Sequence, residues 1–311
     1  MLRDAGFDLL YPCDDRMALG QCTEDETIDL LRDASAVIAW GESYSKRVIE
    51  SLPKLRVISR AGVGYDRVDI AAATAGKVVV TITPNANHEA VAEHTLALLF
   101  AVAKSVAGSD GLIRSGAWPS TSMMSVRGKT LGLVGLGRIG KSVVSRAIAM
   151  RLRVLACDGA PDLEFAREHG VEIVPLNELL AESDFVSLHC PLSEATRGLI
   201  DRKALGLMKA GSVLINTARG GLVVEDDLIE ALRSGHLWGA GLDVLVKEPP
   251  AADNPLLAMP NVVLTPHVAG GDKQALQDMA IEAAQNIVSL HRGEWPNGAV
   301  LTHELRSNWQ W

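Results

Sequence analysis

The chain has 311 residues, enough for two domains of ordinary size, and 48% of them are hydrophobic. Its formal net charge of −8 argues against nonspecific binding to nucleic acid or to an anionic membrane, because both need a basic patch. We therefore expect neither as a partner. An anionic substrate then has to be held by a few placed cations.

The cysteines and the start of the chain exclude further classes. The cysteines form no CxxC pair, so we expect no zinc or other metal site and no disulfide framework. No basic-then-apolar signal pattern opens the chain, and no apolar run reaches the ~18 residues that span a membrane. We expect a cytoplasmic protein with reduced thiols. The four cysteines are Cys13, Cys22, Cys157 and Cys190.

Short apolar runs alternate with amphipathic stretches, which is typical of βα units around a parallel sheet. A long apolar helix is predicted from Glu89 to Val106. The following segment, Ala107 to Gly128, is rich in glycine and serine, and we predict a loop that marks a domain boundary. The other elements expected before this boundary are strands at Ala36–Ala39, Leu55–Ser59 and Val78–Ile82, and helices at Glu26–Asp33, Lys46–Leu52 and Val68–Ala75.

A second alternating series follows the boundary and ends in a helix at Asp272–Leu290. Its predicted strands are Leu131–Val134, Val154–Cys157, Glu172–Val174, Phe185–Leu188, Val213–Asn216, Gly239–Asp243 and Val262–Leu264. Its predicted helices are Ile139–Met150, Asp162–His169, Glu178–Ala181, Lys203–Leu207 and Glu225–Ser234.

A glycine-rich turn follows the first strand of this second series. Gly135, Gly137 and Gly140 have GxGxxG spacing, which lets the backbone approach a pyrophosphate at the N-terminus of a helix. The pattern alone is a weak signal. Asp158 strengthens it, because it ends the next strand 18 residues after Gly140, near the ~20 expected of the carboxylate that binds a ribose diol.

Asp158 also selects between the two nicotinamide cofactors. Its carboxylate repels the 2′-phosphate of NADP, and neither Gly159 nor Ala160 offers that phosphate a cation. The sequence therefore predicts NAD as the cofactor.

Three loops after predicted strands carry the groups that hydride transfer at a hydroxyl-bearing carbon needs. The reaction needs a cation for the carboxylate, a base for the hydroxyl proton and a group that orients the base. Arg219, Glu248 and His267 lie in these loops. Ligands of open parallel sheets bind beyond the carboxyl ends of the strands, so we expect the loops to converge. Taken singly, each residue has an ordinary explanation: a surface arginine, a solvated loop carboxylate, and a capping or packing histidine.

The motifs, in their order, resemble those of the D-isomer-specific 2-hydroxyacid dehydrogenase family, which includes phosphoglycerate dehydrogenases, glyoxylate and hydroxypyruvate reductases and D-lactate dehydrogenases. The resemblance runs from about Ser35 to His291. The matching motifs are Arg60-Ala-Gly-Val-Gly-Tyr-Asp-Arg-Val-Asp, Thr83-Pro-Asn-Ala-Asn, Ala92-Glu-His-Thr, Gly128-Lys-Thr-Leu-Gly-Leu-Val-Gly-Leu-Gly-Arg-Ile-Gly, His189-Cys-Pro-Leu, Asn216-Thr-Ala-Arg-Gly-Gly, Leu242-Asp-Val and Thr265-Pro-His.

The resemblance implies a role for each candidate catalytic residue. His267 is the general acid/base, Glu248 is its partner, and Arg219 binds the carboxylate and carbonyl of the substrate. Backbone N–H groups at Val63 and Gly64 also hold the carboxylate.

The same resemblance implies a cofactor-binding set. Asp243 and the carbonyl of Ala218 hold the nicotinamide carboxamide, and Cys190 lines the cofactor cleft through its backbone. A catalytic thiol is an alternative for Cys190 that we do not favour. The full set is Thr95, Gly135, Gly137, Arg138, Ile139, Gly140, Asp158, Cys190, Ala218 and Asp243.

The implied fold is α/β, with two doubly wound parallel-sheet domains. A Rossmann NAD-binding domain at residues 107–270 is inserted into a flavodoxin-like substrate domain made from residues 1–106 and 271–311. Family members are usually dimers through the nucleotide domain, so we expect a homodimer.

The chain departs from the family pattern at two places. The family begins with a βα unit, whereas Leu2–Pro12 matches the end of its first helix and its second strand, so we expect an upstream start or an unusual substrate domain. Phosphoglycerate-oxidising relatives tend to carry Arg-Ser after the strand matching Val37–Ala39, where this chain has Trp40-Gly-Glu-Ser. Glu42 would oppose a substrate phosphate, although Arg60 nearby can bind one.

We therefore predict NAD-dependent interconversion of a small D-2-hydroxy acid and its 2-keto acid. The candidate pairs are of the 3-phosphoglycerate, glycerate/hydroxypyruvate or glycolate/glyoxylate type. Two alternatives stay open: an NAD-sensing transcriptional corepressor of the same fold, and a homologue that binds NAD without turnover.

Overall fold

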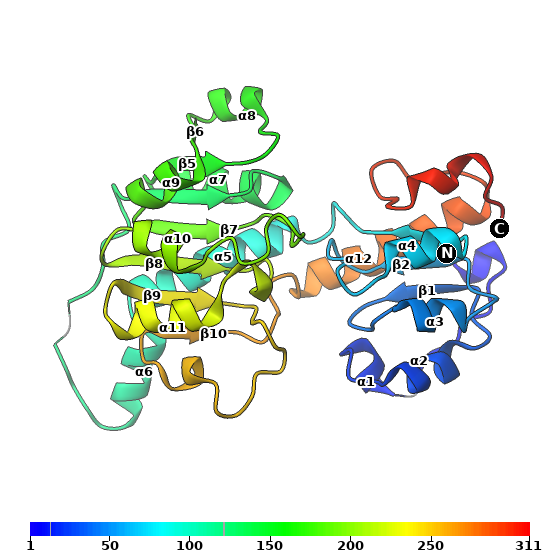
Figure 1. The fold of residues 1–311 in the computed structure, drawn as a ribbon, viewed down its shortest axis with the longest axis horizontal. Coiled ribbons are helices and arrows are strands. Elements are labelled where there is room, and N and C mark those ends of the chain that lie inside the picture. The colour runs from blue at the N-terminus through cyan, green and yellow to red at the C-terminus, as the bar shows by residue number, and fades with distance from the viewer. Residues whose placement is uncertain (13, 121) are drawn as a thin grey trace. The chain divides into compact units, whose positions relative to one another are not determined.

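The computed structural model describes residues 1–12, 14–120 and 122–311, and it divides the chain into two compact units (Figure 1). Unit 1 consists of Met1–Asn87 and Gly271–Trp311, and unit 2 of His88–Gly270. Each unit is a parallel sheet flanked by helices, so the predicted α/β class is confirmed.

Unit 1 contains a three-stranded parallel sheet in the order β1-β2-β3. Every residue of β2 and β3 is buried, as expected for parallel strands covered on both faces. The described elements are η1 (Arg3–Ala5), α1 (Asp15–Ala18), α2 (Glu24–Leu31), β1 (Ala36–Ala39), α3 (Lys46–Glu50), β2 (Val57–Arg60), α4 (Ile70–Ala75), β3 (Val79–Thr81), α12 (Lys273–His291) and η4 (His303–Ser307).

Short polar side chains fix where the helices of unit 1 begin. Thr23 and Glu26 form a capping box at α2, and the side chains of Ser45, Asp69 and Asp272 accept backbone N–H groups at α3, α4 and α12. Such caps satisfy backbone donors that have no partner within the helix.

The last residues of the chain complete the core of unit 1. The backbone N–H of Leu301 donates to Val80 O, so the tail covers the β3 edge of the sheet. Trp309 is buried with Ile287 and Leu290 of α12 against one face of the strands. Residues 7–12, matched to a family strand by resemblance, form no strand here, because no neighbouring strand pairs with them.

Unit 2 contains a seven-stranded parallel sheet in the order β10-β9-β8-β7-β4-β5-β6. From β4 the chain adds β5 and β6 on one side and then crosses back to place β7 on the other side of β4. This reversal makes the carboxyl end of β4 a topological switch point. The strands are β4 (Thr130–Val134), β5 (Arg153–Cys157), β6 (Glu172–Ile173), β7 (Phe185–Leu188), β8 (Ser212–Asn216), β9 (Leu237–Leu242) and β10 (Val262–Leu264).

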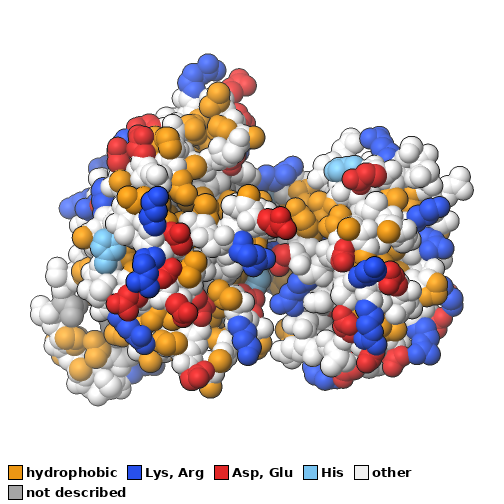
Figure 2. Space-filling model, viewed as in Figure 1, with side chains coloured by type: hydrophobic (Ala, Val, Ile, Leu, Met, Phe, Trp, Pro, Cys, Tyr) orange, Lys and Arg blue, Asp and Glu red, His pale blue; other side chains and the backbone are white. Residues whose placement is uncertain are grey.

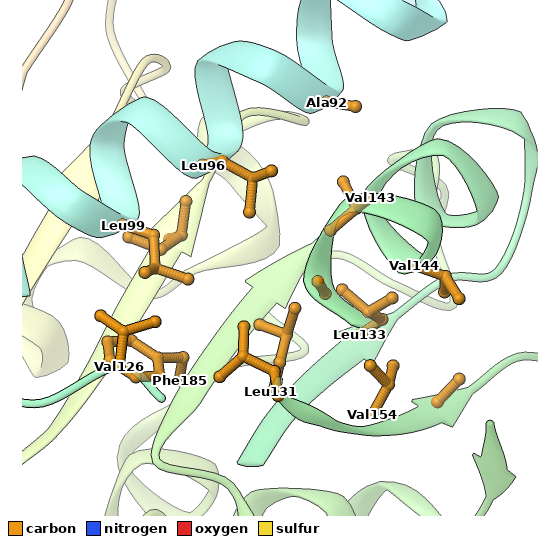
Figure 3. Close-up of a cluster of buried hydrophobic side chains, with 14 of the residues drawn as sticks. Ala92, Leu96, Leu99, Val126, Leu131, Leu133, Val143, Val144, Val154 and Phe185 are labelled. Carbon is orange, nitrogen blue, oxygen red and sulfur yellow. The ribbon is translucent and has the colours of Figure 1, made fainter. Parts of the chain in front are cut away.

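Helices cover both faces of this sheet. Figure 3 shows side chains of α5 and α7 directed toward those of β4, β5 and β7. Burial of each Val, Leu or Phe side chain among them contributes about 1.5–3 kcal/mol to the stability of the fold. The helices are α5 (His88–Ala103), α6 (Val106–Arg114), α7 (Arg138–Ala149), α8 (Leu163–Glu168), α9 (Leu176–Glu182), α10 (Arg202–Leu207), η2 (Gly220–Leu222), α11 (Glu225–Arg233) and η3 (Pro255–Ala258).

The region after α5 differs from the prediction. The predicted loop at 107–128 was wrong in its first part, because α6 occupies Val106–Arg114. Two glycines made this stretch look irregular, and Ser105 separates α6 from α5 with a left-handed φ of 45°. The compact units also divide at residue 88 rather than 107, because α5 packs on α7, β8 and β9.

Among the residues that the structure describes, no group of three or more His, Cys, Asp or Glu has the arrangement of a metal site. No single described helix is both long and apolar enough to cross a membrane; α5 and α6 pass that test only as a pair bent by 57°. Cys22, Cys157 and Cys190 are unpaired, and Cys13 lies outside the described residues. On the face drawn in Figure 2, basic and acidic side chains are interspersed.

Candidate functional site

The three candidate catalytic residues lie beyond the carboxyl ends of adjacent strands of unit 2. Arg219 follows β8, Glu248 follows β9 and His267 follows β10, and these strands are neighbours in the sheet. Parallel strands end at one edge, so the three loops start close together. The structure therefore groups the residues as the motif order predicts.

Glu248 and His267 form a direct pair. His267 Nδ1 lies 2.7 Å from Glu248 Oε2, with side-chain exposures of 47% and 24%. The other carboxylate oxygen of Glu248 accepts the backbone N–H of Leu245, which fixes the direction of the carboxylate. Because Glu248 Oε2 is an acceptor, Nδ1 of His267 carries a hydrogen, and Nε2 is the ring nitrogen that is left to gain or lose a proton.

The Arg219 loop is built against the Glu248 loop. The side-chain amide of the buried Asn216 donates to Arg219 O, and its carbonyl accepts the N–H of Ala218. A Cβ on Gly220 would lie only 2.1 Å from the carbonyl carbon and oxygen of Leu245, so only glycine lets the two loops approach this closely. Arg219 Nη1 donates to Ala218 O over 2.7 Å, which orients the guanidinium.

His267 has a left-handed backbone with φ 55°, which costs a non-glycine residue about 1–2 kcal/mol. Asp243 holds that conformation. Its backbone oxygen accepts the N–H of His267, and its carboxylate accepts the N–H groups of Val268 and Ala269, each at 2.8–2.9 Å. The carboxylate of Asp243 is therefore already used to position this loop, and the resemblance did not reveal that use.

The glycine-rich turn lies at the switch point between β4 and β7. A Cβ on Gly135 would lie 2.7 Å from the backbone nitrogen of Cys190, and one on Gly140 would lie 2.4 Å from Gly135 O. A Cβ on Gly137, the residue that precedes α7, would meet no atom of the chain within 4 Å. Gly135 and Gly140 thus allow tight packing, whereas Gly137 leaves open space in front of the α7 N-terminus. Arg138 and Ile139 form the first turn of α7.

Asp158 stands at the end of β5 beside this turn. Its two carboxylate oxygens accept the backbone N–H groups of Leu136 and Ala160, at 2.7 and 2.8 Å. The open space at Gly137, the free first turn of α7 and this oriented carboxylate fit the pyrophosphate and ribose diol of NAD.

Two further groups border the glycine-rich turn and stay uncharged near neutral pH. Burial raises the pKa of the Cys190 thiol to about 11, so the thiol stays protonated and is a poor nucleophile. Burial also lowers the pKa of His189 to about 4, so its imidazole is neutral. These surroundings argue against a catalytic thiol at Cys190.

Thr95, which the resemblance assigns to the cofactor-binding set, packs inside unit 2. It is fully buried in α5, and its hydroxyl donates to Val91 O and lies 2.9 Å from the hydroxyl of Thr217. Thr217 precedes Ala218 and Arg219 in the loop after β8. Thr95 therefore supports that loop from within the core.

Val63 and Gly64, the predicted carboxylate-binding residues, belong to unit 1. They follow β2 in a loop whose start is fixed by Gly62, since its N–H donates to Thr83 Oγ1 over 2.7 Å. Arg60 Nε donates to Gly64 O over 3.1 Å and ties the end of the strand to the loop.

Sequence reasoning gave no role to His94, Asn216, Thr217 or Thr265. The structure connects each of them to a catalytic loop. The available signal was the polar pair His94-Thr95, which follows Glu93 and directly precedes the apolar run Leu96–Ala103 of α5.

Comparison with known proteins gives a family match over more than half of the chain. Residues 96–269 match the D-isomer specific 2-hydroxyacid dehydrogenase, NAD binding domain. The chain is 41% identical over 280 residues to a glyoxylate reductase of Korarchaeum cryptofilum, a match that covers 88% of this chain and 84% of that protein. It is 39% identical over 282 residues to a D-3-phosphoglycerate dehydrogenase of Methanocaldococcus jannaschii, a match that covers 89% of this chain and 54% of that protein. The chain thus spans about half the length of that second relative.

A solved structure matches the whole architecture. D-lactate dehydrogenase from Aquifex aeolicus, complexed with NAD and lactic acid, superimposes with a TM-score of 0.82 at 29% identity, covering 91% of this chain and 90% of that one. The predicted α/β class with a Rossmann domain for NAD is confirmed. The prediction of two doubly wound sheets was wrong for unit 1, because its three described strands follow one another in chain order.

The different packing of two glycines gives a test of the cofactor site. We expect Gly137→Ala to raise the dissociation constant of NADH at least about tenfold, because its methyl group enters the open space at the α7 N-terminus, while the free energy of unfolding changes by less than about 0.5 kcal/mol. Gly140→Ala is expected to lower that free energy by about 1–3 kcal/mol, since Gly135 O has to shift. Fluorescence titration and urea unfolding measure the two quantities. Unchanged NADH affinity in Gly137→Ala contradicts the assignment.

Proposed function

Because this chain belongs to the D-isomer-specific 2-hydroxyacid dehydrogenase family, we propose that it interconverts a small unphosphorylated 2-keto acid, of the glyoxylate or hydroxypyruvate type, with its D-2-hydroxy acid. The family makes the chain an NAD-dependent oxidoreductase. The observation that carries the proposal is the 2.7 Å pair of Glu248 and His267 beside the Arg219 loop.

NAD, when bound, supplies or takes up the hydride. His267 Nε2 gives a proton to the carbonyl oxygen during reduction and takes it back during oxidation. Glu248 stabilises the charged imidazolium and holds the ring with Nε2 directed away from the carboxylate. A general acid of this kind contributes about 10²–10⁴-fold to the rate.

Arg219 binds the substrate. The planar guanidinium binds a carboxylate with two parallel hydrogen bonds and polarises the adjacent carbonyl. The family resemblance also assigns carboxylate binding to the backbone N–H groups of Val63 and Gly64 in unit 1. Ala218 O and the first turn of α7 orient the cofactor. Asp243, whose buried carboxylate already accepts the N–H groups of Val268 and Ala269, acts on the cofactor site through the loop that it holds.

A buried carboxylate in unit 1 supports an unphosphorylated substrate. Glu42 is only 4% exposed, its Oε2 accepts the backbone N–H of Trp40 over 2.6 Å, and its Oε1 lies 3.4 Å from the hydroxyl of the buried Tyr44. Burial raises the pKa of Glu42, and the positive charge of Arg60 opposes that rise. Glu42 therefore lies within electrostatic reach of the arginine that bonds to Gly64 O.

Arg60 and Glu42 determine the electrostatic potential around the loop that contains Val63 and Gly64. In this proposal the rest of a substrate bound at Val63 and Gly64 lies toward Arg60, because Arg60 Nε donates to Gly64 O, and Glu42 interacts electrostatically with that arginine. A phosphoryl group in the same region carries up to two negative charges and is repelled by a carboxylate that its surroundings hold in place. Glyoxylate and hydroxypyruvate have no such group.

A homologue that binds NAD without turnover has no need of a Glu248 that is oriented by Leu245 and joined to His267 at hydrogen-bond distance, so we favour an active enzyme over it. An NAD-sensing corepressor of this fold keeps the same three residues, and turnover of a keto acid distinguishes the enzyme from it.

Optical measurement of NADH oxidation tests the proposed substrates. We expect kcat/KM for glyoxylate and hydroxypyruvate to exceed that for phosphohydroxypyruvate at least about tenfold, and pyruvate to rank between them. Glu42→Gln removes the charge with little change of shape, and it is expected to raise the phosphohydroxypyruvate-to-glyoxylate ratio of kcat/KM about tenfold.

The matched control is Glu50→Gln, an exposed carboxylate of α3 in the same unit, which should leave the ratio unchanged. A wild-type preference for phosphohydroxypyruvate refutes the proposed substrate. Absence of turnover with every acid refutes the proposed activity.

We also propose that the protein works as a cytoplasmic homodimer. No residue of α6 is buried, and Val106, Leu112 and Ile113 are all more than a third exposed. A helix of nine residues with two glycines is not stable alone in water, so a second copy that packs on its apolar side accounts for it. Unpaired cysteines at the described positions fit a reducing compartment.

Sedimentation equilibrium tests the dimer. The wild-type protein is expected at twice the chain mass at micromolar concentration, and Ile113→Glu at the single-chain mass, because a carboxylate cannot be buried there without a partner. Leu163→Glu, on the exposed side of α8, is the control and should stay dimeric. A monomeric wild-type protein refutes this proposal.

A further inference from the structure

His94 of α5 contacts the catalytic part of unit 2 from a position that the mechanism does not use. Its Nε2 lies 2.9 Å from Thr265 Oγ1 and 3.6 Å from Asp243 Oδ1, with 23% of the side chain exposed. Thr265 follows β10 and stands two residues before His267. The contact therefore joins a core helix to the loop of the acid/base residue.

The single hydroxyl proton of Thr265 fixes the direction of these hydrogen bonds. Thr265 donates its single hydroxyl proton to Asp243 Oδ1 over 2.6 Å. Its oxygen can therefore only accept from His94, which requires a hydrogen on His94 Nε2. The result is a directed relay in which His94 donates to Thr265 and Thr265 donates to Asp243.

The relay ends on the residue that holds the strained loop. The Asp243 carboxylate accepts from Thr265 and from the N–H groups of Val268 and Ala269, while its backbone oxygen accepts from His267 N. A rotation of this carboxylate would release three bonds at once. His267, with its φ of 55°, would then relax away from Glu248.

The next residue of α5 acts in the same way on a second loop. Thr95 gives its proton to Val91 O, so it accepts from the hydroxyl of Thr217 beside the Arg219 loop. Two adjacent polar side chains on one buried helix thus reach both loops that carry the catalytic residues.

We propose that His94 is a positioning residue for catalysis, acting through the Thr265–Asp243 relay to keep His267 directed at Glu248. This inference rests on the proposed acid/base role of His267. His94 touches neither that imidazole nor Glu248 in this arrangement, so its effect passes through the loop.

Four variants separate positioning from packing. His94→Phe keeps a planar ring but removes the donor, and we expect kcat to fall at least about tenfold with KM for NADH changed less than about twofold. His94→Gln restores an N–H donor at the same reach and should recover most of kcat. Thr265→Val should match His94→Phe, and the double variant should be no slower than either single one, because both break the same relay.

His236→Phe is the matched control. His236 also uses Nε2 in one hydrogen bond, to Leu205 O at 3.0 Å, but at a place remote from the catalytic loops, and kcat should stay unchanged. Unchanged kcat in His94→Phe, or additive losses in the double variant, overturn the proposal.

A second measurement does not depend on activity. In ¹⁵N-histidine-labelled protein, His94, assigned by its loss in His94→Phe, is expected to carry its hydrogen on Nε2. A hydrogen on Nδ1 alone overturns the relay. Absence of wild-type turnover together with an Nε2-protonated His94 refutes the proposed function while the relay itself stands.

Discussion

The parallel direction of all seven strands in unit 2 is the constraint from which the site follows. Each strand ends at the same edge, so each loop that carries a functional group starts there. The reversal between β4 and β7 opens that edge for the glycine-rich turn, and the neighbouring ends of β8, β9 and β10 bring Arg219, Glu248 and His267 together. Burial of β4, β7 and β8 between helices keeps these ends in place.

Precision at this edge comes from polar groups directed inward. Asp243 holds the left-handed backbone of His267, Asn216 holds the Arg219 loop, and Leu245 N–H directs Glu248. Each bond satisfies a buried or half-buried polar group that would otherwise be costly to remove from water. The strain at His267 is therefore balanced by its own neighbours, which also keep it at hydrogen-bond distance from Glu248.

The sequence predicts the sheets well, because doubly buried parallel strands are continuous apolar runs: the predicted strands form with ends shifted by one or two residues. It also predicts the three loop residues and the glycine-rich turn, whose spacing reflects backbone geometry. It does not predict α6, because Gly108 and Gly111 interrupt the apolar pattern of this short helix. The relay from His94 is invisible as well, because it joins residues 171 positions apart whose contact depends on how α5 packs.

In the proposed mechanism His267, held by Glu248, moves the proton of the reaction. The rate of glyoxylate reduction by His267→Ala at saturating NADH, measured together with its NADH dissociation constant, tests this role most directly. We expect kcat to fall at least about 10²-fold, with NADH affinity unchanged within about twofold. A His267→Ala enzyme that keeps a rate within about threefold of wild type would contradict it.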